Sequence, residues 1–146
     1  MNETQEYLLK LVDGKEAHDD FLSVAARFTP AMINKKVPAR AYTPWHLIEH
    51  IRITQKDIVD YTIGTNYKEL DWPKDYWPAV TAKATMEDWN KTIKEYKKDI
   101  EKLKDLITNK FDTKILKRTL LVVDHTAYHT GELSLARSAL KKKSAK

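Results

Sequence analysis

Apolar residues recur every three or four positions along most of the chain, a spacing that predicts amphipathic helices. Strand-like alternation is scarce, and only three glycines and five prolines interrupt the 146 residues. The predicted helices span residues 3–28, 44–63, 86–107 and 113–140. We therefore predict an all-α fold, a four-helix bundle formed by a single domain over residues 1–146.

Turn and capping residues set the helix boundaries. In the first helix one face carries Tyr7, Leu11, His18, Phe21, Leu22 and Ala25. Gly14 lies on this face, where a missing side chain leaves room inside a bundle. Thr43 as N-cap and Pro44 at the first helical position start the second helix. Thr85 and Asp88 form the pattern of a capping box before the third helix.

Residues 64–84 (GTNYKELDWPKDYWPAVTAKA) show no helical periodicity and contain glycine, proline and two tryptophans. We predict a long crossover loop between the second and third helices, a kind of loop that is often functional. Its cluster Trp72, Pro73, Tyr76 and Trp77 suits either a lid over one end of the bundle or a small core within the loop.

The last two helices differ in what they turn inward. The third presents only apolar and aromatic groups at alternating steps of three and four: Met86, Trp89, Ile93, Tyr96, Ile100, Leu103 and Ile107. The inward stripe of the fourth helix is Ile115, Val122, His125, His129, Leu133, Ala136 and Leu140. We therefore expect polar chemistry on the fourth helix and none on the inward seam of the third.

Four of the five histidines form two pairs with i, i+4 spacing, His46 with His50 and His125 with His129. This spacing places two side chains on one helix face about 6 Å apart, close enough to share a metal ion. On the second helix His50 faces inward, whereas His46 is rotated about 40° toward solvent. The alternative is a set of core histidines satisfied by hydrogen bonds, but each would need its own polar partner.

Other polar residues near this stripe leave more than one role open. His18 points inward by periodicity and suits a fourth ligand, an acid or base in a pocket, or a hydrogen-bonded core residue. Asp57 suits either a contact behind the metal ligands or a solvated acid. The segment HTAYH carries Thr126 where an HExxH metalloprotease has its glutamate, which excludes that mechanism.

Composition narrows the classes of function. There is no cysteine, so any metal must bind to nitrogen and oxygen ligands. The net charge of +5 is spread among alternating lysines and acids, with a basic tail at 141–146 that we expect to be flexible, and this pattern argues against nucleic-acid binding. With no bilayer-length apolar run and no signal-like N-terminus, we expect a soluble cytoplasmic protein without membrane contact.

Two segments carry a resemblance to a known family. TPWHLIEHIRITQKDIVDY and DHTAYHTGELSLARSAL together resemble the DinB/YfiT-like superfamily of metal-dependent four-helix bundles, and KEAHDDF and WPKDYWP extend the likeness. In that family one histidine of the second helix and an HxxxH pair in the last helix bind a divalent ion. The resemblance therefore implies His50, His125 and His129 as ligands. Glu132 stands where the family motif suggests glutamine, and it suits a metal-tuning group, a catalytic base or an exposed acid.

Three neutral imidazoles leave a coordination position open for water or a substrate atom. We therefore expect a metal-dependent enzyme with His18 and Glu132 as catalytic groups and His46 as a further proton carrier. The resemblance adds a hydrolase, or an S-transferase that uses a low-molecular-weight thiol, acting on a small-molecule substrate. The alternative is a non-catalytic, metal-stabilised binding or stress-response module. The ligand set suits zinc, nickel, iron and copper alike.

Three apolar residues of the fourth helix, Leu120, Val123 and Leu135, lie off its inward stripe. A single core-facing stripe does not account for them, although neighbouring helices could cover them. Together with the aromatic loop, they predict self-association into a homodimer.

Overall fold

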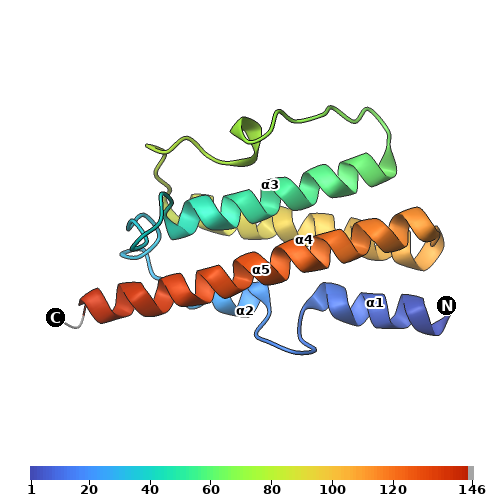
Figure 1. Ribbon diagram of the computed structural model, residues 1–146, viewed down its shortest axis with the longest axis horizontal. Coiled ribbons are helices and arrows are strands. Elements are labelled where there is room, and N and C mark those ends of the chain that lie inside the picture. The colour runs from blue at the N-terminus through green and yellow to red at the C-terminus, as the bar shows by residue number, and fades with distance from the viewer. Residues whose placement is uncertain (145–146) are drawn as a thin grey trace.

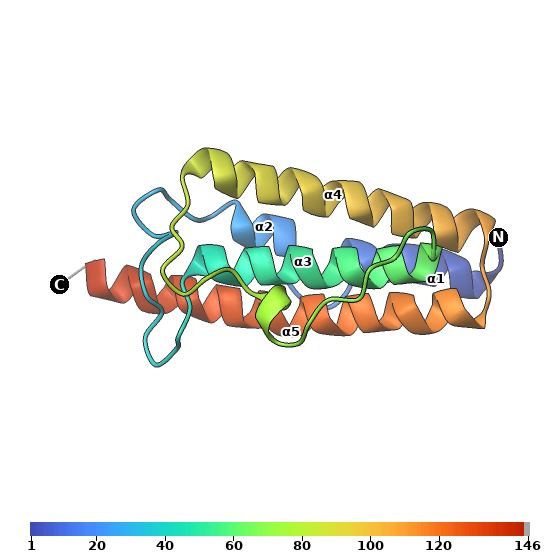
Figure 2. The same cartoon turned by 90° about the horizontal axis from the view of Figure 1, so that it is seen from above.

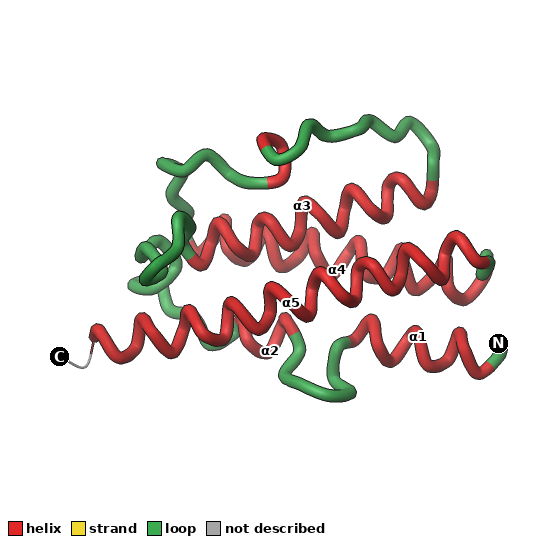
Figure 3. Tube along the Cα trace, viewed as in Figure 1, coloured by secondary structure: helices red, strands yellow, loops and turns green. Residues whose placement is uncertain are grey.

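Helices account for all the regular secondary structure of residues 1–144, which the computed structural model describes (Figures 1 and 3). The elements are α1 (Glu3–Asp13), α2 (Phe21–Ala25), α3 (Pro44–Ile63), the short 3-10 helix η1 (Lys74–Tyr76), α4 (Met86–Asn109) and α5 (Thr113–Ser144). Four of them, α1, α3, α4 and α5, are long. The predicted all-α four-helix bundle is confirmed.

The helix α3 lies between α4 and α5 and packs against both (Figures 1 and 2). On the other side of the bundle α1 and α2 follow one another along α5, where the sequence predicts one continuous helix. One core runs through the bundle, and its largest fully buried side chains include Ile33, Leu47, Ile48, Ile51, Leu103, Ile107 and Leu133.

The prediction of a single first helix over residues 3–28 is wrong. Gly14 ends α1 with a left-handed backbone (φ +71°), and its N–H donates to the carbonyl of Leu11. Asp20 then starts α2 by accepting a hydrogen bond from the backbone N–H of Ser23. The intervening residues bulge away from the bundle (Figure 1), so His18 is exposed in this loop and the prediction that it points inward is also wrong.

The break also changes which face of the first segment is buried. Leu8 and Val12 are buried, whereas Tyr7 is 54% exposed, so the inward face of α1 lies one residue away from the predicted one. Beyond the break Phe21 and Ala25 are buried as predicted. A single helical register therefore cannot be carried through Gly14.

The predicted starts of the second and third helices are confirmed. Thr43 caps α3 by accepting from the N–H of His46, with Pro44 at the first position, and Thr85 and Asp88 form the capping box of α4. At the other end of the chain, α5 continues through residues 141–144 of the predicted basic tail. Residues 145–146 lie outside the described residues.

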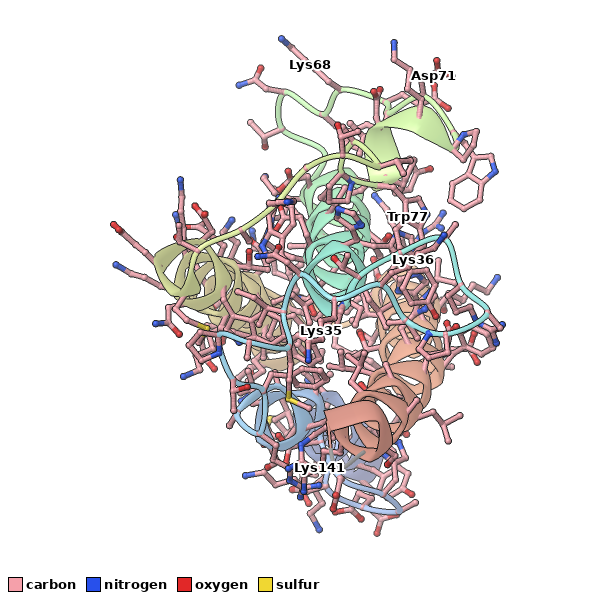
Figure 4. The ribbon with its side chains drawn as sticks, turned by 90° about the vertical axis from the view of Figure 1, so that its left-hand side faces the viewer. Lys35, Lys36, Lys68, Asp71, Trp77 and Lys141 are labelled. Carbon is pink, nitrogen blue, oxygen red and sulfur yellow. The ribbon has the colours of Figure 1, made fainter. Side chains whose placement is uncertain are left out.

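The 64–84 loop is confirmed, and it runs back alongside α3 instead of covering an end of the bundle (Figure 1). Two phenols attach it to that helix, because the hydroxyls of Tyr67 and Tyr76 donate to the two oxygens of Asp57 at 2.8 and 2.7 Å. Lys68 and Asp71 point outward from the loop, and Trp77 lies on its inner side (Figure 4). Asp57, predicted as a contact behind the ligands or a solvated acid, thus anchors the loop.

Of the three residues behind the predicted homodimer, two remain on the surface. Leu120 is 45% and Leu135 73% exposed, whereas Val123 is partly buried and packs against the core. For Val123 the alternative holds, since the core of the same chain covers it, and self-association stays a prediction. Among residues 1–144 no helix is long and apolar enough to cross a bilayer.

Alanine substitutions at two glycines test whether the first predicted helix is interrupted at Gly14. We expect Gly14→Ala to lower the free energy of unfolding by about 1 kcal/mol, because an L-residue in the left-handed region is strained even though its Cβ would meet Asp20 at an ordinary 3.5 Å. Gly131→Ala in α5 has open space and should raise it by about 0.5 to 1 kcal/mol. Urea unfolding of both variants measures the two changes. A continuous first helix would make both substitutions stabilising.

Candidate metal centre

The three predicted ligands meet between two helices. His50 comes from the first half of α3, and His125 and His129 lie one turn apart on α5. The Nε2 atom of His50 is 3.1 Å from that of His125 and 3.2 Å from that of His129. One ligand atom from each residue lies within 4.8 Å of the others. Among the described residues, these three side chains form the group that could hold a metal ion.

Hydrogen bonds fix how two of the rings are protonated. Nδ1 of His50 lies 2.8 Å from the carbonyl oxygen of Tyr76, and Nδ1 of His129 lies 2.7 Å from Oε1 of Glu132. Both oxygens accept, so each Nδ1 carries the proton and donates it. The Nε2 atom of each neutral ring therefore presents a lone pair toward the other imidazole.

Two facing lone pairs repel unless a proton or a cation lies between them. Two nitrogens that each lie about 2.1 Å from one ion are about 3.0 to 3.4 Å apart at coordination angles of about 90° to 109°. The separations of 3.1 and 3.2 Å fall in this range. The donor set and its spacing therefore fit a divalent transition-metal ion, for which neutral imidazole is a common ligand.

Burial favours the neutral form of all three rings. It lowers the pKa of His50 to about 4, and the donation to Tyr76 only partly offsets it. The pKa of His125 falls to about 3, through burial and then through the neighbouring His129 and His50. Burial also lowers the pKa of His129, and the hydrogen bond to Glu132 opposes this. At neutral pH the three rings are ready to bind a metal without losing protons.

Glu132 holds His129 and is itself held by Tyr42. Its Oε1 accepts from His129, and its Oε2 accepts from the hydroxyl of Tyr42 at 2.6 Å. Burial and this hydrogen bond raise the pKa of Tyr42 to about 12, so the phenol stays protonated. Of the alternatives for Glu132, the structure supports a group that orients a metal ligand, since its side chain is only 18% exposed. Its catalytic role stays a prediction.

The 64–84 loop supplies the other side of the site. The indole of Trp77 stacks on the imidazole of His50 with centroids 3.8 Å apart and planes within 3°. Tyr42 in turn stacks on Trp77. Of the two alternatives for the loop aromatics, Trp72 and Tyr76 contact one another within the loop, whereas neither alternative predicts Trp77 on His50. The sequence prediction also missed Tyr42, whose only signal was its position just before the cap of α3. The carbonyl of Tyr76 carried no sequence signal, because any residue supplies one.

His46 lies outside this group for a reason different from the predicted one. It is 3% exposed, so the prediction that it turns toward solvent is wrong. Its Nδ1 accepts from the N–H of Thr43 at 3.2 Å, and its Nε2 lies 2.8 Å from the carbonyl of Ala82, to which it donates. His46 thus completes the capping box of α3 and fixes the end of the 64–84 loop.

His18 also lies outside the group of ligand atoms. Its exposed ring contacts the carbonyl of Asp19 at 2.9 Å, in the loop between α1 and α2. It lines a small cavity of about 70 Å³ with Thr126 and Thr130, on the face of α5 that packs against α4 and the α1–α2 loop. The structure brings His50, His125 and His129 together, but not His18. The catalytic role predicted for it stays a prediction.

A four-helix bundle with a crossover loop beside its second long helix, and with three inward histidines on two facing helices, has the architecture of bundles that build a metal site from side chains on facing helices. The sequence profile of the DinB superfamily matches residues 14–133, and the chain belongs to this family. No curated protein and no solved structure matches it.

Substitutions at Glu132 test its hold on His129. We expect Glu132→Ala to weaken metal affinity about 10- to 100-fold, because His129 loses the acceptor that orients its ring. Glu132→Gln keeps an oxygen that can accept from His129, so it should lower the metal affinity less. Competition with a chromophoric chelator measures both affinities. Equal affinities for wild type and Glu132→Ala would show that His129 needs no partner.

The lowered histidine pKa values predict the pH dependence of the metal-free protein. The folded state binds protons on these histidines more weakly than the unfolded state does. The free energy of unfolding is therefore highest above about pH 6.5 and falls as the pH drops toward 4. A thermal unfolding series after chelation should show this loss, and His125→Phe should reduce it. The exposed His18→Gln variant is the matched control and should follow wild type. A flat profile over this range would contradict the prediction.

Proposed function

We propose that this chain binds one divalent metal ion through His50, His125 and His129 and acts as a metal-dependent enzyme on a small molecule, as a hydrolase or a thiol-dependent S-transferase. The observation that carries this proposal is a ligand group of three without a fourth protein ligand among the described residues. His125 and His129 are also only partly buried, which leaves solvent access to the centre. Catalytic sites keep such an open position, whereas structural sites close it.

A bound ion would act as a Lewis acid and lower the pKa of a water molecule or a thiol at the open position. The protein's own part is to hold the rings: Tyr76 fixes His50 through its carbonyl, and Glu132 fixes His129. Trp77 covers one face of His50 and keeps water from it. Glu132 is the carboxylate that is hydrogen-bonded to the cluster, and we assign the predicted proton-accepting role to its Oε2, which faces Tyr42.

The packing argues against the non-catalytic, metal-stabilised alternative. The two helices that a metal would join, α3 and α5, already pack against one another, with Leu47, Ile51 and Leu133 fully buried in the common core. A metal centre that the chain needs in order to fold would be expected where apolar contacts are few. The metal-free chain should therefore keep its fold, and the ion is left free for chemistry.

Metal content tests the ligand set. Purified without a histidine tag, the protein should contain about one divalent ion per chain, because three neutral imidazoles converge on one point. The His125→Ala, His129→Ala double variant should lose the ion. His46→Ala, a substitution of the buried histidine outside the group, should keep it at some cost in stability. Elemental analysis of the three proteins decides the matter, and full retention by the double variant would refute the site.

The open position has a separate test. With cobalt in the site, azide or a small thiol should change the visible absorption spectrum, because such ligands enter the coordination sphere. Circular dichroism before and after chelation should show the same helix content. A spectrum indifferent to added ligands, together with unfolding on chelation, would favour the non-catalytic alternative.

A further inference from the structure

We propose that Arg40 recognises an oxyanionic group, carboxylate or phosphate, of the small molecule that reaches the three-histidine centre. The inference rests on the proposed function, and it names the chemical class of the substrate. Its basis is the segment Val37–Tyr42, which precedes α3 and carries both Arg40 and Tyr42 toward Glu132.

This segment is a closed turn. The N–H of Val37 donates to the carbonyl of Tyr42, and the N–H of Arg40 donates to the carbonyl of Val37, both at 3.1 Å. Within it Pro38 is followed by Ala39 at φ +59°, the arrangement of a type II turn, in which glycine usually fills the third position. Here a residue with a Cβ holds the left-handed conformation. The turn is therefore strained at the residue that precedes Arg40.

The contacts of Arg40 within the protein are few. Its Nε lies 3.7 Å from Oε2 of Glu132, its Nη1 donates to the carbonyl of Ala39 at 3.2 Å, and its guanidinium also donates to the hydroxyl of Tyr42. Its side chain is 54% exposed. About half of the guanidinium-bearing side chain therefore lies in water, beside the carboxylate that orients His129.

The exposed ion pair does not account for this arrangement. A pair at 3.7 Å with one partner half in water contributes about as much as the left-handed backbone of Ala39 costs, or less. The turn therefore gains little stability from placing Arg40 there. Strained backbone of this kind is typical of positions that hold a functional group in place.

The charges around the centre favour an anion. The three imidazoles are neutral, and Glu132 is compensated by Arg40, so a divalent ion leaves this part of the protein with net positive charge. Guanidinium is planar and presents paired donors that match carboxylate and phosphate oxygens. A substrate that reaches the metal with one end and Arg40 with the other would be held at two points, which orients the reacting bond.

Thiols of matched length test this assignment. In the cobalt-loaded protein the probes are ω-mercapto alcohols of increasing length, the corresponding ω-mercapto acids and the phosphate esters of the alcohols. The thiol reports binding at the metal through the cobalt absorption, and the other end probes Arg40. In wild type, acids or phosphate esters of one length should bind more tightly than the alcohol of that length, and preference between them identifies the oxyanion.

The variants separate recognition from folding. Arg40→Gln should weaken the favoured anionic probe roughly tenfold while metal content and alcohol binding stay unchanged, and Arg40→Lys should recover part of the loss. Arg27→Gln is the matched control, because Arg27, just after α2, is a half-exposed arginine paired with Asp19 of the α1–α2 loop. If Arg40→Gln weakens the binding of acids, esters and alcohols equally, or weakens none of them, the role of Arg40 is overturned while the proposed metal site stands. If no thiol perturbs the cobalt spectrum, the open metal position fails and Arg40's role with it.

Discussion

The site depends on one electrostatic constraint, the facing lone pairs of two imidazoles. Tyr76 and Glu132 each take the Nδ1 proton of one ring, so the Nε2 atoms of His50 and His129 meet as two acceptors 3.2 Å apart. Burial resists protonation, which would relieve the repulsion, because it lowers the pKa of both rings. A divalent cation between the two lone pairs would remove the repulsion, and the chemistry proposed for the chain follows from that preference.

The partners of these rings come from outside the two helices that carry them. Tyr76 belongs to the 64–84 loop, and Tyr42, which holds Glu132, belongs to the turn before α3. The four-helix bundle thus supplies the position of the ligands, and two connecting segments supply their orientation. This division explains how one bundle architecture can serve different reactions, since the connections can vary while the core stays the same.

The sequence predicted the features that repeat or that need a particular residue type. The periodicity of α4 and α5, the caps at Thr43 and Thr85 and the convergence of the three histidines are all of this kind. The errors arose where a single local feature overrode the pattern. Gly14 ended a helix that the apolar spacing alone would continue, which moved His18 to the surface. His46 is buried although its rotation on the helix suggests otherwise, because the carbonyl of Ala82 approaches it from a distant part of the chain.

The 64–84 loop is tied down near its middle and near its end, by Asp57 through the hydroxyl of Tyr76 and by His46 through the carbonyl of Ala82. Trp77 between these two ties lies flat on His50. Its motion is therefore restricted before any ion arrives, and little conformational entropy is left to lose on metal uptake. With this side closed, an ion or a chelator would exchange through the α5 side, where His125 and His129 are only partly buried. The rate of metal exchange would then depend on what occupies that side, and a substrate bound there would retain the metal for as long as it stays.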